Sequence, residues 1–554
     1  MPGDQPSSVS RYLLDRIAAA GVRHVFGLPG DYNLTFLDEI EAHPGLRWVG
    51  NANELNAAYM ADGYARVNGL GVVVTTYGVG ELSAMNGIAG SYAENVPVLH
   101  IAGTPSLDIQ RHRVPVHHSL LDGDHGHFLR AAREVTCAVA SLDDVNAAGE
   151  IDRVIGEILR RQKPGYLALP SDLVPKACPR ASAAAVARTR ADGQAPARAF
   201  AGSAARLLDG STTVTVLVDA LAGRRGVAPA LNELIRKARL TAAVTTGGKG
   251  VLDESAGTFA GLYIGELSTP ATRSLVEDAD VVIRFGAVEN DLSTGGFTAR
   301  IDPARCIDIH PDHASIGAVR IGNLTMRQAI DELSGLLDAP AGDPAAAPVP
   351  APPASGDPGA PISQDVLWQR IGGFLRPGDI LAADQGTPFS GLLGQRLPAG
   401  VDVVAQPGWS SIGYALPAVA GAQLAAAPRR RAVLVIGDGA AQLTIQEIGT
   451  LAREGLNPVI VLVNNDGYTV ERAINGPDAA YNDITPWNWQ AIPAAFGASA
   501  VVAQARTAGQ LDEELARLSA GDDRIRLLEV FLGRHDLPLL LKQTAEAVAR
   551  RNTR

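Results

Sequence analysis

Hydrophobic positions along the chain fall into short unbroken runs, separated by longer stretches in which apolar residues recur at helical spacing. Runs rich in valine and isoleucine, with no polar alternation, are typical of strands buried on both faces of a parallel sheet. In the first part of the chain this pattern predicts strands in HVFGLPGD, LRWVGNANE, GLGVVVTTYGVG and PVLHIAGTP. Helices are expected between them, in ELNAAYMADGYARV and SAMNGIAGSYAE.

The same alternation returns twice further along the chain. A second group of strands is expected in TTVTVLVDA, TAAVTTGGKG, DADVVIRFGAVEND and CIDIHPD, and a third in DILAADQGT, RAVLVIGDG, NPVIVLVNN and IRLLEVFL. Strands that alternate with helices indicate α/β domains with parallel sheets. The sequence therefore predicts an α/β fold of three doubly wound parallel-sheet domains.

Two stretches rich in proline and alanine separate the three groups. The first lies around residues 175–198, and the second, DAPAGDPAAAPVPAPPASGDPGAP, is typical of an extended linker. The expected organisation is an N-terminal α/β domain over 1–185, a central one over 195–337, a linker over 338–360 and a C-terminal one over 361–554. A chain of 554 residues is too long for a single hydrophobic core, which agrees with this division.

Composition and charge narrow the class of protein. Apolar residues make up 46% of the chain and charged residues 19%, as in globular proteins, and the net charge of -11 argues against a nucleic-acid partner. The three cysteines are widely separated and show no metal-ligand spacing, which favours a reducing compartment. The N-terminus lacks a signal pattern and no apolar stretch reaches 18 residues, so we expect a cytoplasmic protein without a membrane span.

Two polar turns follow consecutive strands of the third group. RAVLVIGDG ends in Gly-Asp-Gly, a helix is expected in LTIQEIGTLAREG with Gly455 ending it, and PVIVLVNN is followed by Asp-Gly. In such a βαβ unit, Asp438 and Asn465 lie at the carboxyl ends of parallel strands, where open α/β sheets bind ligands. A carboxylate, an amide oxygen and the carbonyl of Gly467 are hard ligands that suit magnesium, and the glycines let a phosphate approach the backbone.

With these motifs the chain resembles the thiamine-diphosphate decarboxylases of the pyruvate/indolepyruvate decarboxylase family. The resemblance covers nearly the whole sequence. It is carried by FGLPGDYN, NANELNAAYMADGYAR, TTYGVGELSAMNGIAGSYAENVP, VHHSLLDGDHGHF, ADQGT, SSIGYALP, IGDGAAQLTIQEIGT and NNDGYTVERAINGPDAAYNDI, in that order. It implies that the N-terminal domain binds the pyrimidine and the C-terminal domain the diphosphate of thiamine diphosphate.

The resemblance also implies the residues of a cofactor site. Asp438, Asn465 and Gly467 would hold Mg²⁺, and Glu54 would protonate the aminopyrimidine. Ile412 would force the cofactor into its bent form, and Ser410 stands where relatives commonly have glycine. The implied cofactor-binding residues are Glu54, Val79, Gly386, Thr387, Ser410, Ile412, Asp438, Gly439, Ala440, Asn465 and Gly467.

Acid–base groups are implied by the same match. Asp31 and the pair His117 and His118 match the family's proton-handling residues, and so does Glu471. Glu471 is expected to act near the leaving carboxylate, Asp31 and His118 to relay protons during product release, and His117 to orient the others. Clusters of carboxylates and histidines suit this task because they titrate near neutral pH. Family geometry places the first segment of one subunit against the third segment of another, in a homodimer or a dimer of dimers (a homotetramer).

The implied reaction is the non-oxidative decarboxylation of a 2-oxo acid to an aldehyde and CO2 through a thiamine ylide and an enamine. Gln385, Phe389 and Val470 resemble the residues of relatives that act on aromatic or branched-chain acids. The predicted substrate order is therefore indole-3-pyruvate or phenylpyruvate, then branched-chain 2-oxo acids, then pyruvate. A carboligase of the acetolactate-synthase type and a non-catalytic cofactor-binding regulator remain as alternatives.

Overall fold

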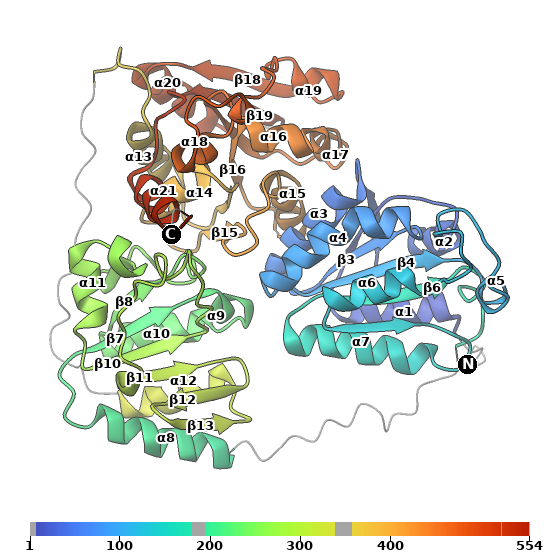
Figure 1. Ribbon diagram of the computed structural model, residues 1–554, viewed down its shortest axis with the longest axis horizontal. Helices are drawn as coiled ribbons and strands as arrows, with labels where there is room; N and C mark the ends of the chain where they lie inside the picture. Colours follow the sequence, from blue (N-terminus) through green and yellow to red (C-terminus); the bar gives the residue numbers. More distant parts are fainter. Residues whose placement is uncertain (1–6, 179–193, 338–356, 427, 522, 553–554) are drawn as a thin grey trace.

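The computed structural model describes residues 7–178, 194–337, 357–426, 428–521 and 523–552. Three sheets flanked by helices form three segments, which Figure 1 shows as separate lobes coloured blue, green and orange to red. Each sheet is wholly or mainly parallel, so the predicted fold class is confirmed. The 338–356 part of the expected linker lies outside the described residues, and the domain boundaries stay predictions.

The first sheet has the strand order β2-β1-β3-β4-β6-β5, and all its pairs are parallel. Its strands are β1 (His24–Gly27), β2 (Arg47–Gly50), β3 (Gly71–Thr75), β4 (Val98–Thr104), β5 (Ala138–Ser141) and β6 (Gly165–Pro170). Its helices are α1 (Val9–Ala19), α2 (Leu34–Glu41), α3 (Glu54–Asn68), α4 (Val79–Ala93), α5 (Leu107–Arg111), α6 (His127–Glu134) and α7 (Ala147–Arg161). β3 and β4 are buried along their whole length, as their unbroken apolar runs predict.

The second sheet has the order β13-β12-β11-β10-β7-β8-β9. Its strands are β7 (Val214–Val218), β8 (Thr241–Val244), β9 (Phe259–Leu262), β10 (Val281–Phe285), β11 (Cys306–Ile309), β12 (His313–Ile316) and β13 (Val319–Gly322). Its main helices are α8 (Gln194–Leu208), α9 (Ala220–Arg224), α10 (Ala228–Ala238), α11 (Pro270–Glu277) and α12 (Met326–Leu336). β12 and β13 add to the edge in antiparallel fashion, so this sheet is mixed rather than purely parallel.

The third sheet has the order β15-β14-β16-β17-β19-β18, again all parallel. Its strands are β14 (Ile380–Ala383), β15 (Asp402–Val404), β16 (Ala432–Gly437), β17 (Val459–Asn464), β18 (Ala500–Ala505) and β19 (Ile525–Phe531). Its helices are α13 (Gln364–Phe374), α14 (Thr387–Leu393), α15 (Ala415–Ala425), α16 (Asp438–Thr444), α17 (Ile448–Arg453), α18 (Thr469–Ile474), α19 (Ile492–Ala495), α20 (Ala508–Ser519) and α21 (Leu539–Asn552).

The described part of the second segment begins with α8 at Gln194, one residue before the expected start of the central domain at 195. One expectation about helix positions is wrong. The helix after the Gly-Asp-Gly turn begins at Asp438 itself, is interrupted by a 3-10 turn at Ile445–Glu447, and resumes as α17. The end of this region is as expected, since α17 stops at Arg453 and Gly455 has a φ of 60°.

The first and third segments share one continuous hydrophobic core, whereas the second has its own. The joint is the pair α3 and α15, which lie side by side in Figure 1. A Cβ added at Gly63 would lie 2.0 Å from the carbonyl oxygen of Ala418, and one at Gly421 would lie 1.9 Å from that of Met60. The two helices therefore meet backbone to backbone, which only glycine permits at these positions.

The three cysteines are free thiols. Cys178 and Cys306 are buried and Cys137 is half-buried, and none of them forms a disulfide. Within the described part of the chain, the helices are all too short or too polar to cross a membrane.

Candidate active site

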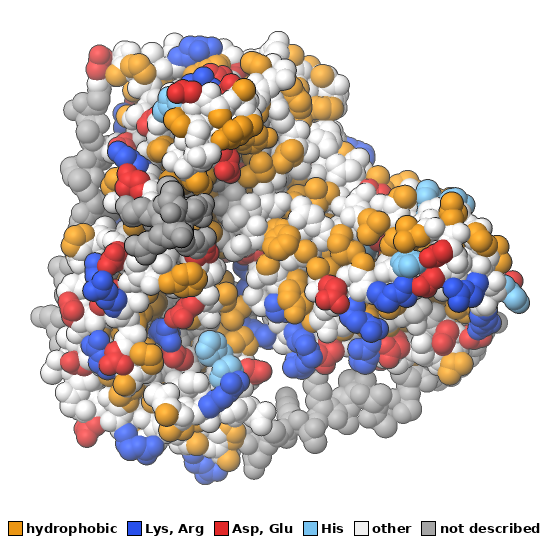
Figure 2. Space-filling model, in the orientation of Figure 1, with side chains coloured by type: hydrophobic (Ala, Val, Ile, Leu, Met, Phe, Trp, Pro, Cys, Tyr) orange, Lys and Arg blue, Asp and Glu red, His pale blue; other side chains and the backbone are white. Residues whose placement is uncertain are grey.

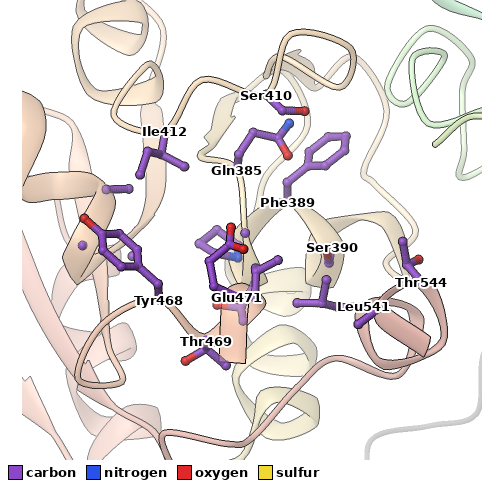
Figure 3. A pocket seen from close by; sticks show the side chains of 18 of the residues that line it. Gln385, Phe389, Ser390, Ser410, Ile412, Tyr468, Thr469, Glu471, Leu541 and Thr544 are labelled. Carbon is purple, nitrogen blue, oxygen red and sulfur yellow. The ribbon is translucent and has the colours of Figure 1, made fainter. Parts of the chain in front are cut away.

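A pocket of about 320 Å³ opens at the carboxyl ends of β14, β16 and β17. Figure 3 shows side chains from several elements converging on it, with the Glu471 carboxylate turned into the cavity. Of the residues that the sequence suggested, the pocket is lined by Gln385, Gly386, Thr387, Phe389, Ser410, Ile412, Asp438, Gly439, Ala440, Asn465, Gly467, Val470 and Glu471. The structure thus brings together, in one cavity, residues that are spread over nearly ninety positions of the third segment.

Three groups converge at the floor of this pocket. The end of the Asn465 amide lies 3.1 Å from the carbonyl oxygen of Gly467 and 3.2 Å from Asp438 Oδ1. With its nitrogen toward these two oxygens the amide donates to both, and with its oxygen toward them it would complete a set of three oxygen ligands. A carboxylate, an amide oxygen and a main-chain carbonyl are ligands that a hard divalent cation prefers. The residues present therefore fit the predicted magnesium site.

The surroundings of Asp438 hold it in place. It is 2% exposed, Oδ1 accepts a hydrogen bond from the backbone N–H of Gly439 (2.7 Å), and Oδ2 accepts from those of Asn465 and Gly467 (both 3.2 Å). Burial raises the pKa of Asp438 to about 6, because the charged form loses its water shell. A divalent cation held here would supply an opposite charge and favour the ionised form of the carboxylate.

Arg472 supports the same turn from behind, and the sequence did not single it out. Its guanidinium is buried and donates to the carbonyl oxygens of Asn465 (3.2 Å) and Asn482 (3.1 Å) and to Asp483 Oδ1 (2.8 Å). These bonds use the carbonyls on the far side of the turn from the pocket. We regard Arg472 as a positioning residue for the three converging groups.

The loop that carries Ser410 and Ile412 is fixed by two buried carboxylates. Asp384, at the end of β14, accepts hydrogen bonds from the backbone N–H groups of Gly413 (3.0 Å) and Ala415 (2.8 Å). Glu94, at the end of α4, accepts from those of Gly408 (2.7 Å) and Trp409 (2.9 Å).

Ser410 itself has a φ of 59°, in the left-handed region that favours glycine, which gives a physical reason for glycine in relatives. Its hydroxyl oxygen is buried without a hydrogen-bond partner, as expected for a group that faces a bound molecule.

Part of the pocket wall comes from segments whose sequence contains no motif of a binding site. Three residues of the second segment line it: Thr246, Ile264 and Leu292. Four residues of α21 also line it: Leu540, Leu541, Thr544 and Ala545. The apolar spacing along the end of the chain could have predicted the helix, but not the surface on which it lies.

Asp31, His117 and His118 form a second cluster, at the carboxyl edge of the first sheet. His117 Nε2 lies 2.6 Å from Asp31 Oδ2, and His118 Nε2 lies 3.8 Å from Asp31 Oδ1. The ring of Tyr32 stacks on His117, with ring centroids 5.1 Å apart. The side chains remain open to solvent, with exposed fractions of 46% for Asp31, 62% for His117 and 34% for His118.

Glu54 and Val79 lie at this same edge. Glu54 is the first residue of α3, and a Cβ added at Gly80 would lie 3.2 Å from its Oε1 atom. Glu447 of the third segment anchors the start of α3 through hydrogen bonds to Asn51 and Asn56. We call Asp31, Glu54, Val79, His117 and His118 the histidine surface. None of its five residues lines the pocket of the same chain.

Hydrophobic side chains are exposed beside the histidine surface. Val79 is 52% and Leu82 49% exposed on α4, and Trp409 and Leu443 of the third segment are also exposed. Figure 2 shows hydrophobic side chains gathered over the α3 and α4 region where it meets the third segment. Exposed apolar patches of this kind are typical of interaction surfaces.

The chain is similar to known proteins along nearly its whole length. The chain matches the N-terminal TPP binding domain of thiamine pyrophosphate enzymes over residues 7–125, their central domain over 202–334 and their C-terminal TPP binding domain over 395–530. It is 48% identical to an alpha-keto-acid decarboxylase of Mycolicibacterium paratuberculosis, over 96% of this chain and 95% of that protein. It is also 48% identical to an alpha-keto-acid decarboxylase of Mycobacterium tuberculosis (99% and 98%) and 47% identical to one of Mycobacterium ulcerans (98% and 96%).

Proposed function

The chain belongs to the thiamine pyrophosphate enzymes, among the alpha-keto-acid decarboxylases, and on that premise we propose that it converts an aromatic 2-oxo acid to the aldehyde and CO2. As a thiamine-diphosphate-dependent 2-oxo acid decarboxylase it shares the reaction of its relatives. The specific part of the proposal is the acid: indole-3-pyruvate or phenylpyruvate first, branched-chain acids second and pyruvate third.

The observation that carries this choice is the apolar wall of the pocket. Phe389, Leu393, Val470 and Ile474 line it, and α21 adds two leucines. A wall of this kind favours a substrate with a large apolar side chain over the methyl group of pyruvate, although apolar pockets discriminate by only about 1–3 kcal/mol per group. Gln385 also lines the cavity, and its amide donates to the backbone oxygen of Gln406 (2.6 Å), which fixes its orientation.

Thiamine diphosphate and Mg²⁺ fit the pocket floor. Asp438, Asn465 and Gly467 would hold the ion, and the amides at the start of α16 would face the diphosphate. When bound, the cofactor supplies an electron sink for the bond that breaks. Glu54 would orient its pyrimidine, and Ile412, on the loop held by Asp384, would support it from the opposite wall.

The residues of the chain have to manage protons, because decarboxylation replaces a carboxylate by a proton. Glu471 is exposed within the pocket and can approach the reacting carbon. Asp31 and His118 are in contact with each other and with solvent, so they can carry a proton between the aldehyde oxygen and water. The Asp31 contact and the Tyr32 stack hold the His117 ring, which agrees with an orienting role.

A homodimer would unite the two halves of this site. The histidine surface and the pocket are separate within one chain, since none of the five residues of the surface lines the pocket. The exposed apolar residues of α4 lie beside the histidine surface and would be covered by the partner. We propose that the histidine surface of one subunit faces the pocket of the other.

The proposal is tested by aldehyde formation from indole-3-pyruvate, phenylpyruvate, 2-oxoisovalerate and pyruvate, each with and without thiamine diphosphate and magnesium. We expect turnover only with the cofactors, and the largest kcat/KM for an aromatic acid. The variant Val470→Ile adds a methylene to the wall and should shift the preference toward pyruvate, by about 10-fold or more. A cofactor-dependent enzyme that prefers pyruvate would refute the substrate assignment alone.

The product identifies the reaction class. Aldehyde as the main product supports decarboxylation, in which the intermediate is protonated. A coupled hydroxyketone as the main product would instead assign the enzyme to the carboligases, and absence of any cofactor-dependent product would leave a binding protein.

A further inference from the structure

The histidine surface contains three side chains that can reach a single ion. Asp31, His117 and His118 each offer one ligand atom, and these three atoms lie within 4.8 Å of one another. Two imidazoles and one carboxylate form a ligand set that suits zinc and other divalent transition metals. The pocket offers only oxygens to its cation, so the two sets differ in chemistry as well as in place.

We propose that Asp31, His117 and His118 form a binding site for a divalent transition metal ion, zinc being the ion that the ligand set suits best, and that this ion inhibits the enzyme. The site is a second one, additional to the cation site at the pocket floor. Magnesium is a poor occupant because it prefers oxygen ligands in an octahedral arrangement.

The present distances are close to those that a bound ion requires. A tetrahedral ion with bonds of about 2.0 Å holds its ligand atoms about 3.3 Å apart. The contact between His117 Nε2 and Asp31 Oδ2, now 2.6 Å, has to open, and that between His118 Nε2 and Asp31 Oδ1, now 3.8 Å, has to close. Both changes are below about 1 Å, within the range of small side-chain rotations.

Neighbouring groups already orient the two imidazoles. Tyr32 stacks on the His117 ring at an interplanar angle of 21°, and its hydroxyl donates to the backbone oxygen of His117 (3.4 Å). A Cβ added at Gly78 would lie 1.9 Å from the backbone oxygen of His118, so the backbone there is packed against α4. Such support is what holds metal-binding histidines in one orientation. All three side chains are at least one-third exposed within one chain, so no other segment of the same chain closes the site.

Inhibition, unlike binding, rests on the proposed function. A metal ion takes the lone pairs of the imidazole nitrogens and the carboxylate, which are the same lone pairs that accept a proton. Asp31 and His118 would then no longer relay protons to the aldehyde oxygen. Zinc would lower kcat and leave the cofactor in place.

The test uses the full-length enzyme saturated with thiamine diphosphate and magnesium, so that the oxygen site is filled. Zinc binding is measured by titration calorimetry. Cobalt(II) serves as a second probe, because tetrahedral cobalt with nitrogen ligands absorbs visible light far more strongly than octahedral, oxygen-bound cobalt. We expect His117→Gln and His118→Gln each to weaken zinc binding at least about tenfold, the loss seen even when only a supporting partner of a ligand is removed.

A matched control is available in the second segment. His310 and His313 also form a close pair, with ring centroids 4.6 Å apart, and lie away from the histidine surface. His310→Gln should leave both the zinc affinity and the cobalt spectrum unchanged. Equal zinc affinity in the wild type and in the His117 and His118 variants would overturn the proposal, as would a wild type without the strong cobalt bands.

Activity assays on the same samples separate this proposal from the one above. Reversible loss of aldehyde formation with zinc, relieved by a zinc chelator, supports inhibition. If the protein forms no aldehyde but binds zinc through His117 and His118, the metal site stands and the proposed function fails.

Discussion

The pocket of the third segment and the histidine surface of the first are built on the same kind of sheet edge, yet they enclose their polar groups to different degrees. Asp438 and Asn465 are 2% and 4% exposed and are held by backbone hydrogen bonds, whereas His117 is 62% exposed. Groups that hold a charged ligand benefit from a rigid, dry environment, because little has to reorganise on binding. Groups that move protons need contact with water and room to turn. The comparison teaches that the same kind of sheet edge can enclose polar groups in one segment and leave them exposed in another.

The largest effect on ligand binding is expected from a substitution in the pocket of the third segment. Asp438→Ala removes one of the three converging groups, so magnesium affinity should fall by at least about a hundredfold, and thiamine diphosphate should no longer be retained. Calorimetric titration with each ligand measures this. Asp466→Asn is the matched control, since it removes a neighbouring exposed charge that does not point into the pocket. Equal magnesium affinity in Asp438→Ala and the wild type would show that the cation binds elsewhere.

The separation of the two regions is tested by mixing subunits. Glu54→Gln inactivates the histidine surface and Asp438→Ala the pocket, so neither homodimer should turn over. In a mixed dimer one site combines the intact surface of one subunit with the intact pocket of the other. Random pairing should then restore about a quarter of wild-type activity, since half of the dimers are mixed and each has one intact site.

Co-expression with two different tags and purification on both isolates the mixed dimer for a direct rate measurement. A mixed dimer as inactive as its parents would mean that each site is completed within a single chain.

Glu471 lines the pocket but, unlike Asp438 and Asn465, its side chain is exposed. Glu471→Gln keeps the size of the side chain and removes its proton, so turnover should fall by at least about tenfold while cofactor binding stays normal. Steady-state kinetics and calorimetry on the same preparation check both halves of this statement. Near-native turnover would remove Glu471 from the proton transfers.

The smallest effect concerns a buried acid beneath the histidine surface. Glu81 accepts hydrogen bonds from the backbone N–H of Gly78 (2.8 Å) and from the Tyr166 hydroxyl (2.6 Å), and burial raises its pKa from 4.5 to about 7. Between these pH values the folded protein keeps a proton that the unfolded chain releases, so this group makes stability fall as pH rises. Above about pH 7 both states are ionised, and the buried charge costs its full amount.

Glu81→Gln has no proton to lose, so its melting temperature relative to the wild type should rise between about pH 5 and about pH 8. We expect a relative gain of several degrees, since each 1 kcal/mol corresponds to about 2–4 °C in a domain of 150–250 residues. Thermal denaturation at the two pH values measures it. A constant difference would show that Glu81 does not change its charge in this range.

The sequence was sufficient to locate the strand ends and the residues that follow them. Asp438 and Asn465 were expected at the ends of neighbouring strands because two short apolar runs joined by one helix form a βαβ unit, whose strands are parallel. The structure shows β16 and β17 paired in parallel. The Asp31, His117 and His118 cluster came from the family resemblance, and its contacts could be seen only in the structure. Their dimeric arrangement is still a prediction.

Other parts of the site could not be predicted, for physical reasons. The α21 helix lines the pocket together with residues far away in sequence. Its amphipathic pattern predicts that one face is buried, but not which part of the molecule buries it. Asp384 and Arg472 act through hydrogen bonds to backbone groups, which depend on the tertiary path and leave no pattern in side-chain spacing.

The backbone contact between α3 and α15 has a mechanical consequence. Helices that meet at Gly63 and Gly421 leave no layer of side chains to slide past each other, so the first and third segments of a subunit are expected to move as one rigid body. Changes of shape within a subunit would then involve elements outside this joint, such as the second segment, which has a hydrophobic core of its own.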